Sequence, residues 1–186
     1  WRWLLVAGVI AAAVYLGSWR VHIFSSDLHA RSGRWYLQAE AIPKAEQELD
    51  RALELNSSNF QAWADLSKVY TMKREYKKVF AAASRARPGH DVPNLLNRTA
   101  FAYLRLGEVE EARQLLATSA HRHPNFGATY MNWGNLNFWQ AEEAMGEDHF
   151  TRARSLLNKA FACYSQAQIW NREYAIPRSL SLRYLE

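Results

Sequence analysis

The pattern of apolar and polar positions changes once, near residue 25. From Trp3 to Trp19 the chain carries no charge for seventeen residues, and Arg2 and Arg20 bracket this run. A helix of that length spans about 25 Å at 1.5 Å per residue, slightly less than the roughly 30 Å hydrocarbon layer of a bilayer. Snorkelling of Arg20, with the apolar residues Val21, Ile23 and Phe24 beyond it, would make up the difference. The pattern therefore predicts an N-terminal transmembrane helix, with residues 1–25 as the anchor.

Small residues four positions apart within this run predict a helix contact inside the membrane. In lipid, close approach of two backbones drives the association of helices. We therefore expect a partner helix to contact Gly8, Ala12 and Gly17. A cleaved secretory signal peptide or a buried core helix would give a similar run, and these two alternatives stay open.

After residue 25, apolar residues recur with the spacing of amphipathic helices, in pairs that repeat about every 34 residues. The repeats are expected at 26–59, 60–92, 93–126 and 127–165. The clearest one places small and large apolar residues at Leu96, Ala100, Tyr103, Gly107, Ala112, Leu116, Ala120 and Pro124. The fourth repeat has about seven extra residues between its helices, around Ala144–Asp148. We interpret residues 166–186 as a capping helix and tail.

Composition favours an all-α chain. Only 8 Gly and 5 Pro interrupt 186 residues, 49% of which are hydrophobic, and no segment alternates as a strand would. A single helical hairpin cannot bury its apolar face, so three or more hairpins have to stack. The expected fold is an α-solenoid of about four hairpins that follows the membrane helix.

The repeat positions resemble the tetratricopeptide repeat, which carries Trp, Leu, Gly and Tyr on its first helix and Ala, Phe, Ala and Pro around its second. In the second repeat the first helix reads Trp63, Leu66 and Tyr70, with Ser67 in place of glycine. The resemblance covers about three-quarters of the chain.

This resemblance implies a concave groove, lined by the first helices of successive repeats, that receives a peptide or a partner helix. Carried over by position, the groove residues are Arg31, Arg34, Lys68, Asn97, Phe101, Asn132, Asn135 and Phe138. Arginine can pair with carboxylates and asparagine can bond to peptide groups, so such a groove suits an acidic or extended peptide. An ordinary solvated face is the alternative interpretation.

The positive charge is concentrated in one stretch. The whole chain has a net charge of +5, but Lys68 to Arg87 contains seven basic residues and one acid, a surplus of six. Four of them, Lys73, Arg74, Lys77 and Lys78, crowd one turn, and we call these four the basic knob. A local knob suits anionic lipid or protein rather than nucleic acid, because tracking of phosphates needs an extended stripe. A solvated turn is the alternative.

Residues that would indicate catalysis are missing from the sequence. There is no glycine-rich phosphate loop, no paired-cysteine zinc spacing and no nucleophile elbow. His121 and His123 would point in different directions on a helix, and they suit a helix end better than a metal site. Cys163, the only cysteine, is expected to fill the core. We expect no enzyme activity, no cofactor, no metal and no small-molecule substrate.

The function that follows is a membrane-anchored scaffold that docks protein subunits of a larger complex. The family resemblance suggests a bacterial inner membrane with the repeats in the periplasm. One alternative is the last span and repeat region of a polytopic envelope enzyme, such as a surface-polysaccharide ligase or polymerase. A weaker alternative is an organellar import receptor.

Overall fold

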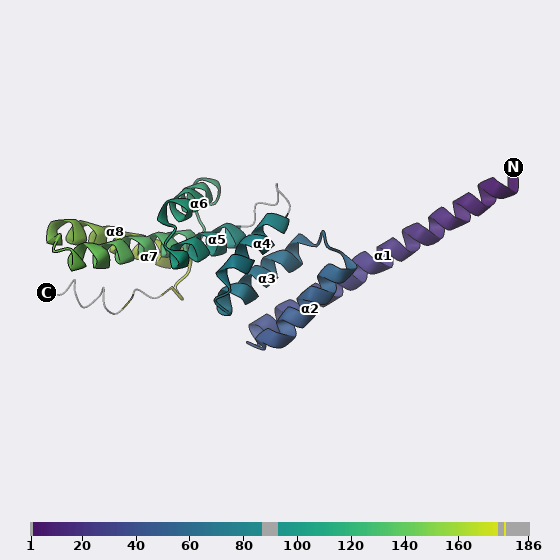
Figure 1. The fold of residues 1–186 in the computed structure, drawn as a ribbon, viewed down its shortest axis with the longest axis horizontal. Helices are drawn as coiled ribbons and strands as arrows, with labels where there is room; N and C mark the ends of the chain where they lie inside the picture. The colour runs from purple at the N-terminus through teal and green to yellow at the C-terminus, as the bar shows by residue number, and fades with distance from the viewer. Residues whose placement is uncertain (1, 87–92, 175–176, 178–186) are drawn as a thin grey trace. The chain divides into compact units, whose positions relative to one another are not determined.

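A computed structural model describes residues 2–86, 93–174 and 177, and these residues form eight helices and no strand. The chain divides into two compact units, 1–90 and 91–186. The first unit contains α1 (Arg2–Gln38), α2 (Ile42–Leu55), α3 (Phe60–Met72) and α4 (Tyr76–Arg85). The second contains α5 (Pro93–Leu106), α6 (Val109–Arg122), α7 (Gly127–Gly146) and α8 (Phe150–Trp170). Figure 1 labels the helices of both units.

In the first unit, α1 and α2 form a hairpin because a small residue lets the two backbones approach. A methyl group added at Gly33 would lie 2.6 Å from Cγ of Leu49, so only hydrogen fits there. Leu49 and Ala52 are fully buried in the same apolar cluster as Leu66 and Val69 of α3. The hairpin therefore buries its apolar face against the next helix, as a stacked repeat requires.

Each of the four hairpin turns contains one residue in the left-handed conformation. These residues are Glu40, Arg74, Gly107 and Asp148, with φ of 57°, 60°, 82° and 60°. In each turn the N–H of the following residue donates to the carbonyl five residues earlier, at 2.8 to 3.0 Å, which caps the first helix. Only one of the four is glycine, so each of the other turns carries a backbone cost of about 1 kcal/mol that packing must offset.

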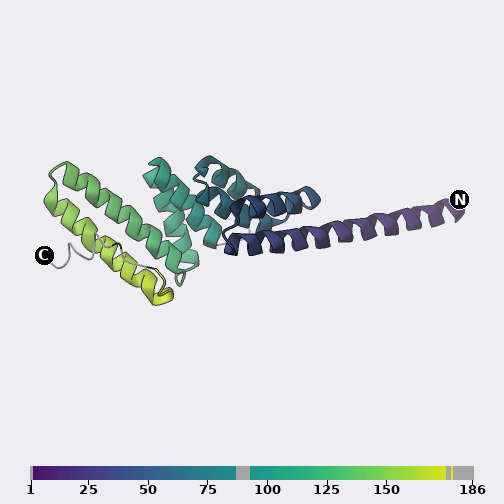
Figure 2. The ribbon, with the colours of Figure 1, turned by 90° about the horizontal axis from the view of Figure 1, so that it is seen from below.

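The second unit repeats the same construction in α5–α6 and α7–α8. Ala112 of α6 is fully buried beside Leu104 and Leu136. In the last hairpin, Gly134 leaves room for the ring of Tyr164, which is 1% exposed. Burial raises the pKa of the Tyr164 phenol well above its usual range, and its hydroxyl donates to Oδ1 of Asn135 at 2.8 Å. Figure 2 shows α7 and α8 lying side by side along their length.

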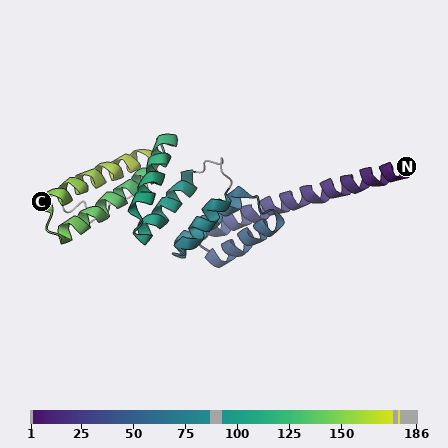
Figure 3. The same cartoon turned by 45° about the horizontal axis from the view of Figure 1, so that its top comes forward.

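Three features differ from the sequence-based expectation. Residues 25 and 26 lie within one continuous helix, α1, so no break separates the expected anchor from the first repeat; Figure 3 shows its N-terminal half extending beyond α2. Residues 144–146 end α7 and residues 147–149 form a short turn, so the extra length of the fourth repeat lies in α7 and α8, which have 20 and 21 residues. Residues 166–170 continue α8, and most of the expected tail lies outside the described residues.

The predicted transmembrane helix is not supported by the structure. Across the described residues, no helix is both long and apolar enough to cross a membrane.

Gly134→Ala should destabilise the second unit by about 1–3 kcal/mol, because the new methyl group would lie 2.5 Å from the Tyr164 ring. Urea denaturation followed by circular dichroism measures the change. Gly146→Ala on the same helix is the matched control, since an added methyl group there meets nothing within 4 Å. Equal stability of the two variants would contradict the described packing of α7 on α8.

Candidate partner-binding surfaces

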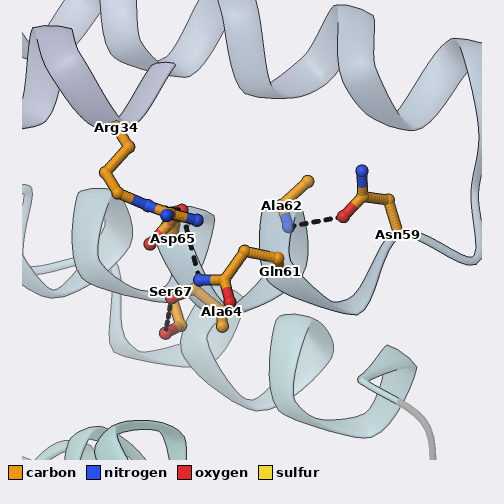
Figure 4. A network of polar contacts seen from close by, with 7 residues as sticks. All are labelled: Arg34, Asn59, Gln61, Ala62, Ala64, Asp65 and Ser67. Carbon is orange, nitrogen blue, oxygen red and sulfur yellow. Dashed lines mark hydrogen bonds and ion pairs between the residues drawn. The ribbon is translucent and has the colours of Figure 1, made fainter. Parts of the chain in front are cut away.

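In the first unit, the predicted groove residues lie on α1 and α3, and one of them is held by an ion pair. Nε of Arg34 donates to Oδ2 of Asp65 at 3.0 Å, and Nε2 of Gln61 donates to the same oxygen at 3.4 Å. Asp65 is 7% exposed, so Arg34 supplies the charge partner that this buried carboxylate needs (Figure 4). Arg31 is exposed and Lys68 is half-buried. Arg34 is therefore engaged within the chain.

In the second unit, two predicted groove amides form a buried hydrogen-bond network. Nδ2 of Asn97 donates to Oγ of Ser119 at 2.8 Å and to Oγ1 of Thr129 at 3.0 Å. Nδ2 of Asn132 donates to the carbonyl oxygen of Asn97 at 3.0 Å. Asn97 and Asn132 are 3% and 9% exposed. These amides join α5, α6 and α7 to one another.

The remaining predicted groove residues of the second unit are half-buried. Asn135 accepts the bond from Tyr164, and Phe138 packs against the cluster formed by Ala160 and Tyr164. Phe101 is half-buried on α5. The surface of this unit that remains accessible therefore combines partly exposed aromatic rings with polar groups.

The basic knob lies beside acidic residues of the same chain. Nζ of Lys73 lies 2.9 Å from Glu46 and 3.1 Å from Glu75, and Nζ of Lys78 lies 2.7 Å from Glu75. Hydrogen bonds from Lys78 and Lys73 lower the pKa of the Glu75 carboxyl. Lys73 therefore joins the first hairpin to the second.

Further acids on α2 reduce the net charge of this region. Asp50 interacts electrostatically with Glu46, Glu54, Lys73 and Lys78, and its pKa is raised first by burial and then by the two neighbouring carboxylates. All four members of the basic knob are exposed, and two of them, Lys73 and Lys78, interact with acids of α2 and of the following turn, so the knob is not an isolated positive patch.

The residues predicted to contact a helix within the membrane are exposed on α1. Gly8, Ala12 and Gly17 all lie on the surface. A methyl group added at Gly8 or Gly17 would meet no atom within 4 Å, so this part of the helix is open to an external contact.

Candidate chemistry is limited in the described part of the chain. No group of three or more His, Cys, Asp and Glu side chains there is arranged to hold a metal ion. Cys163 is half-buried, and burial raises the pKa of its thiol, which disfavours the reactive thiolate. His121 and His123 lie at the end of α6, at its last turn and its C-cap.

Several polar partners were not identified from the sequence. Asp65, Ser119 and Thr129 are buried and complete the networks of Arg34 and Asn97. The 34-residue period could have indicated one contact between repeats. Arg105 and Trp139 lie 34 residues apart, and the guanidinium of Arg105 stacks 5.7 Å from the ring centroid of Trp139. Hydrogen bonds between unlike side chains on different helices leave no such periodic signal.

Solved structures with similar folds contain tetratricopeptide repeats. The chain is 17% identical to MamA over 76% of this chain and 80% of that one, with a TM-score of 0.59. It is 18% identical to YrrB, a TPR protein with an unusual peptide-binding site, over 84% and 90%, with a TM-score of 0.57. Cut9–Hcn1 of the APC/C gives 15% identity over 87% of this chain and 36% of that one, with a TM-score of 0.60.

The fold is a tetratricopeptide-like helical repeat. Neither a protein-family description nor a curated protein matches the sequence. The likeness to the solved structures concerns the fold and extends to none of their ligands.

Asn97→Ala should destabilise the second unit by about 2 kcal/mol, because the buried partners of this amide lose a donor. Asn94→Ala on the same helix is the control: its side chain is exposed, so we expect a change within about 0.5 kcal/mol. Thermal denaturation measures both. An Asn97→Ala protein that melts like the parent would contradict a structural role for this amide.

Proposed function

We propose that this chain is a non-enzymatic scaffold whose helical repeats bind protein partners. The observation that carries the proposal is the tandem series of tetratricopeptide-like hairpins, which resembles solved repeat proteins including a peptide-binding one. Stacked hairpins present side chains from successive first helices on a common face, and such repeated faces suit extended partners. The half-buried thiol and the ion-paired carboxylates described above supply no catalytic constellation.

The partner that fits best is an acidic or extended peptide. In the first unit, Lys68 of α3 presents positive charge. In the second unit, Arg105 of α5, whose guanidinium lies over the Trp139 ring, presents positive charge, and Phe101 and Trp139 present partly exposed aromatic surface. Arg34, Asn97 and Asn132 have internal partners, so we assign them to shaping the surface rather than to direct recognition. In each unit a peptide carboxylate would pair with the cation, and in the second unit apolar side chains of the peptide would contact the rings.

The charge-reversed double variant Lys68→Glu/Arg105→Glu should lose about tenfold in affinity for protein partners, because two attractive contacts become repulsive. The measurement is quantitative co-purification of tagged full chain from native cells. The control, Arg154→Glu/Lys159→Glu, makes the same charge change on exposed positions of α8. Partner recovery that is equal for both variants would place binding elsewhere than at Lys68 and Arg105.

We also propose that the chain serves as a subunit of a membrane complex, with the repeats in the periplasm. The support is the uncharged run from Trp3 to Trp19, which precedes the repeats. The basic knob adds little support for lipid binding, because Lys73 and Lys78 pair with acids of the same chain.

The chain should therefore remain in the membrane pellet after alkaline extraction, and Gly8→Arg/Ala12→Arg should release it, since each buried charge costs about 3 kcal/mol in the bilayer. The control is Glu142→Arg/Glu143→Arg, at exposed positions of α7. Release of the parent by alkali would rule out an integral anchor. Protection of the repeats from protease added to spheroplasts would contradict a periplasmic location.

A further inference from the structure

The first helix of each repeat has equivalent positions, and their burial differs sharply in α1. On α3, Ala62 and Val69 are 0% exposed. The residues 34 positions earlier, Leu28 and Trp35, are 48% and 62% exposed. In the repeat that begins at residue 127, the same positions counted from the start of the repeat are Thr129 and Leu136 of α7, which are 0% and 1% exposed. The first hairpin therefore exposes large apolar side chains at positions that α3 and α7 bury.

The reason for the difference is the element that precedes each helix. Ala62 and Val69 belong to an apolar cluster that includes Leu49 of the α1–α2 hairpin, and Leu136 belongs to one that includes Ala112 of the α5–α6 hairpin. Before residue 26, α1 continues as a helix to Arg2 instead of turning into a preceding hairpin. Nothing in the described part of the first unit takes the place of that hairpin.

The exposed side chains form one stripe, which we call the α1 stripe: Val21, Phe24, Leu28 and Trp35. At 100° per residue these four positions fall within about 60° of the helix circumference. The buried positions Ser26, Ala30, Gly33 and Leu37 lie on the opposite side, centred about 180° away. The two sides of α1 are thus both apolar, and one of them lacks a covering element. A contiguous exposed apolar face of this kind indicates a contact surface.

The charges beside the stripe indicate what can cover it. Arg20 and Arg31 are exposed along one edge of the stripe. The acid between them, Asp27, accepts a hydrogen bond from Nδ2 of Asn59 at 3.1 Å, so it is engaged with α3. Arg31 lies seven residues after Phe24 and three residues after Leu28, so it continues the heptad spacing of the stripe. A second copy packed in parallel would therefore oppose Arg31 to itself, which is unfavourable, whereas a carboxylate would pair with it.

We infer that the α1 stripe is a docking site for an amphipathic helix of a partner protein. The apolar face of that helix covers Val21, Phe24, Leu28 and Trp35, and an acidic residue at its edge pairs with Arg31. Residues 21–35 extend about 22 Å, which matches roughly four turns of a partner helix. This rests on the proposed function and deepens it by naming a binding surface on α1, which includes the predicted groove residue Arg31 and excludes Lys68 and Arg105, together with the chemistry of its occupant.

Site-specific photocrosslinking in native cells tests the inference on the full chain. A benzoyl-phenylalanine residue replaces Leu28 or Trp35, and the crosslinked segment is identified by mass spectrometry. Leu106, 42% exposed in the second unit, is the matched control position for the same replacement. We expect crosslinks from positions 28 and 35, at least tenfold above the control, to a protein segment that has helical apolar periodicity and acidic residues at its edge.

A second arm tests the pairing with Arg31. Arg31→Glu should reduce the crosslink yield about tenfold, and Arg31→Lys should retain most of it. Crosslinks to a second copy of this chain, crosslinks to lipid alone, or a yield no higher than that of the control would each overturn the inference. So would an unchanged yield with Arg31→Glu.

The groove variant separates this inference from the proposed function. Lys68→Glu/Arg105→Glu should leave the crosslinks from positions 28 and 35 unchanged. Partners that co-purify in a groove-dependent manner without these crosslinks would overturn only the docking site on α1. Failure to recover any partner by either route would count against both the scaffold and the docking site.

Discussion

The close approach of the two helices in a hairpin is the constraint on which the described structure depends. At Gly33 and Gly134 there is space for a hydrogen atom and not for a methyl group, because Leu49 and Tyr164 fill the facing positions. The contact that results buries a large side chain completely in each case. Apolar burial of this kind offsets the left-handed turn residues Glu40, Arg74 and Asp148, which adopt a conformation that non-glycine residues disfavour.

Polar side chains in this fold serve largely to connect helices. The amide of Asn97 joins residues of α5, α6 and α7, and the pair formed by Arg34 and Asp65 joins α1 to α3. Such groups must be satisfied because an unpaired buried polar atom is costly. From the sequence, such polar residues resemble residues that bind a partner protein. Their hydrogen bonds and ion pairs within the chain show that they join helices instead. The accessible surfaces are consequently the partly exposed rings and cations of the first helices and the uncovered outer side of α1.

The 34-residue period made much of the helical arrangement predictable. Helices α3, α5 and α7 begin at Phe60, Pro93 and Gly127, where the period starts its units, because amphipathic spacing and turn residues are local signals. Where the helix boundaries differ from the prediction, the residues are helical as expected, but the helix continues through a position where an end was predicted. The sequence around residue 25 contains no helix-breaking residue, so α1 passes through it, and the extra residues of the last repeat extend helices that were already helical in pattern. A period cannot show whether a helix ends or simply continues.

By itself, the sequence determined an all-α repeat chain, the paired helices within it, a lone cysteine and the concentration of positive charge near residues 68–87. Those properties follow from composition and short-range spacing. Only the tertiary structure decided that Lys73 and Lys78 are paired with acids, that Asn97 and Asn132 are buried in a network, and that Leu28 and Trp35 are exposed where their equivalents are covered. Each of these depends on which helix packs beside which, and residues about 30 positions apart in sequence meet only when the hairpins stack.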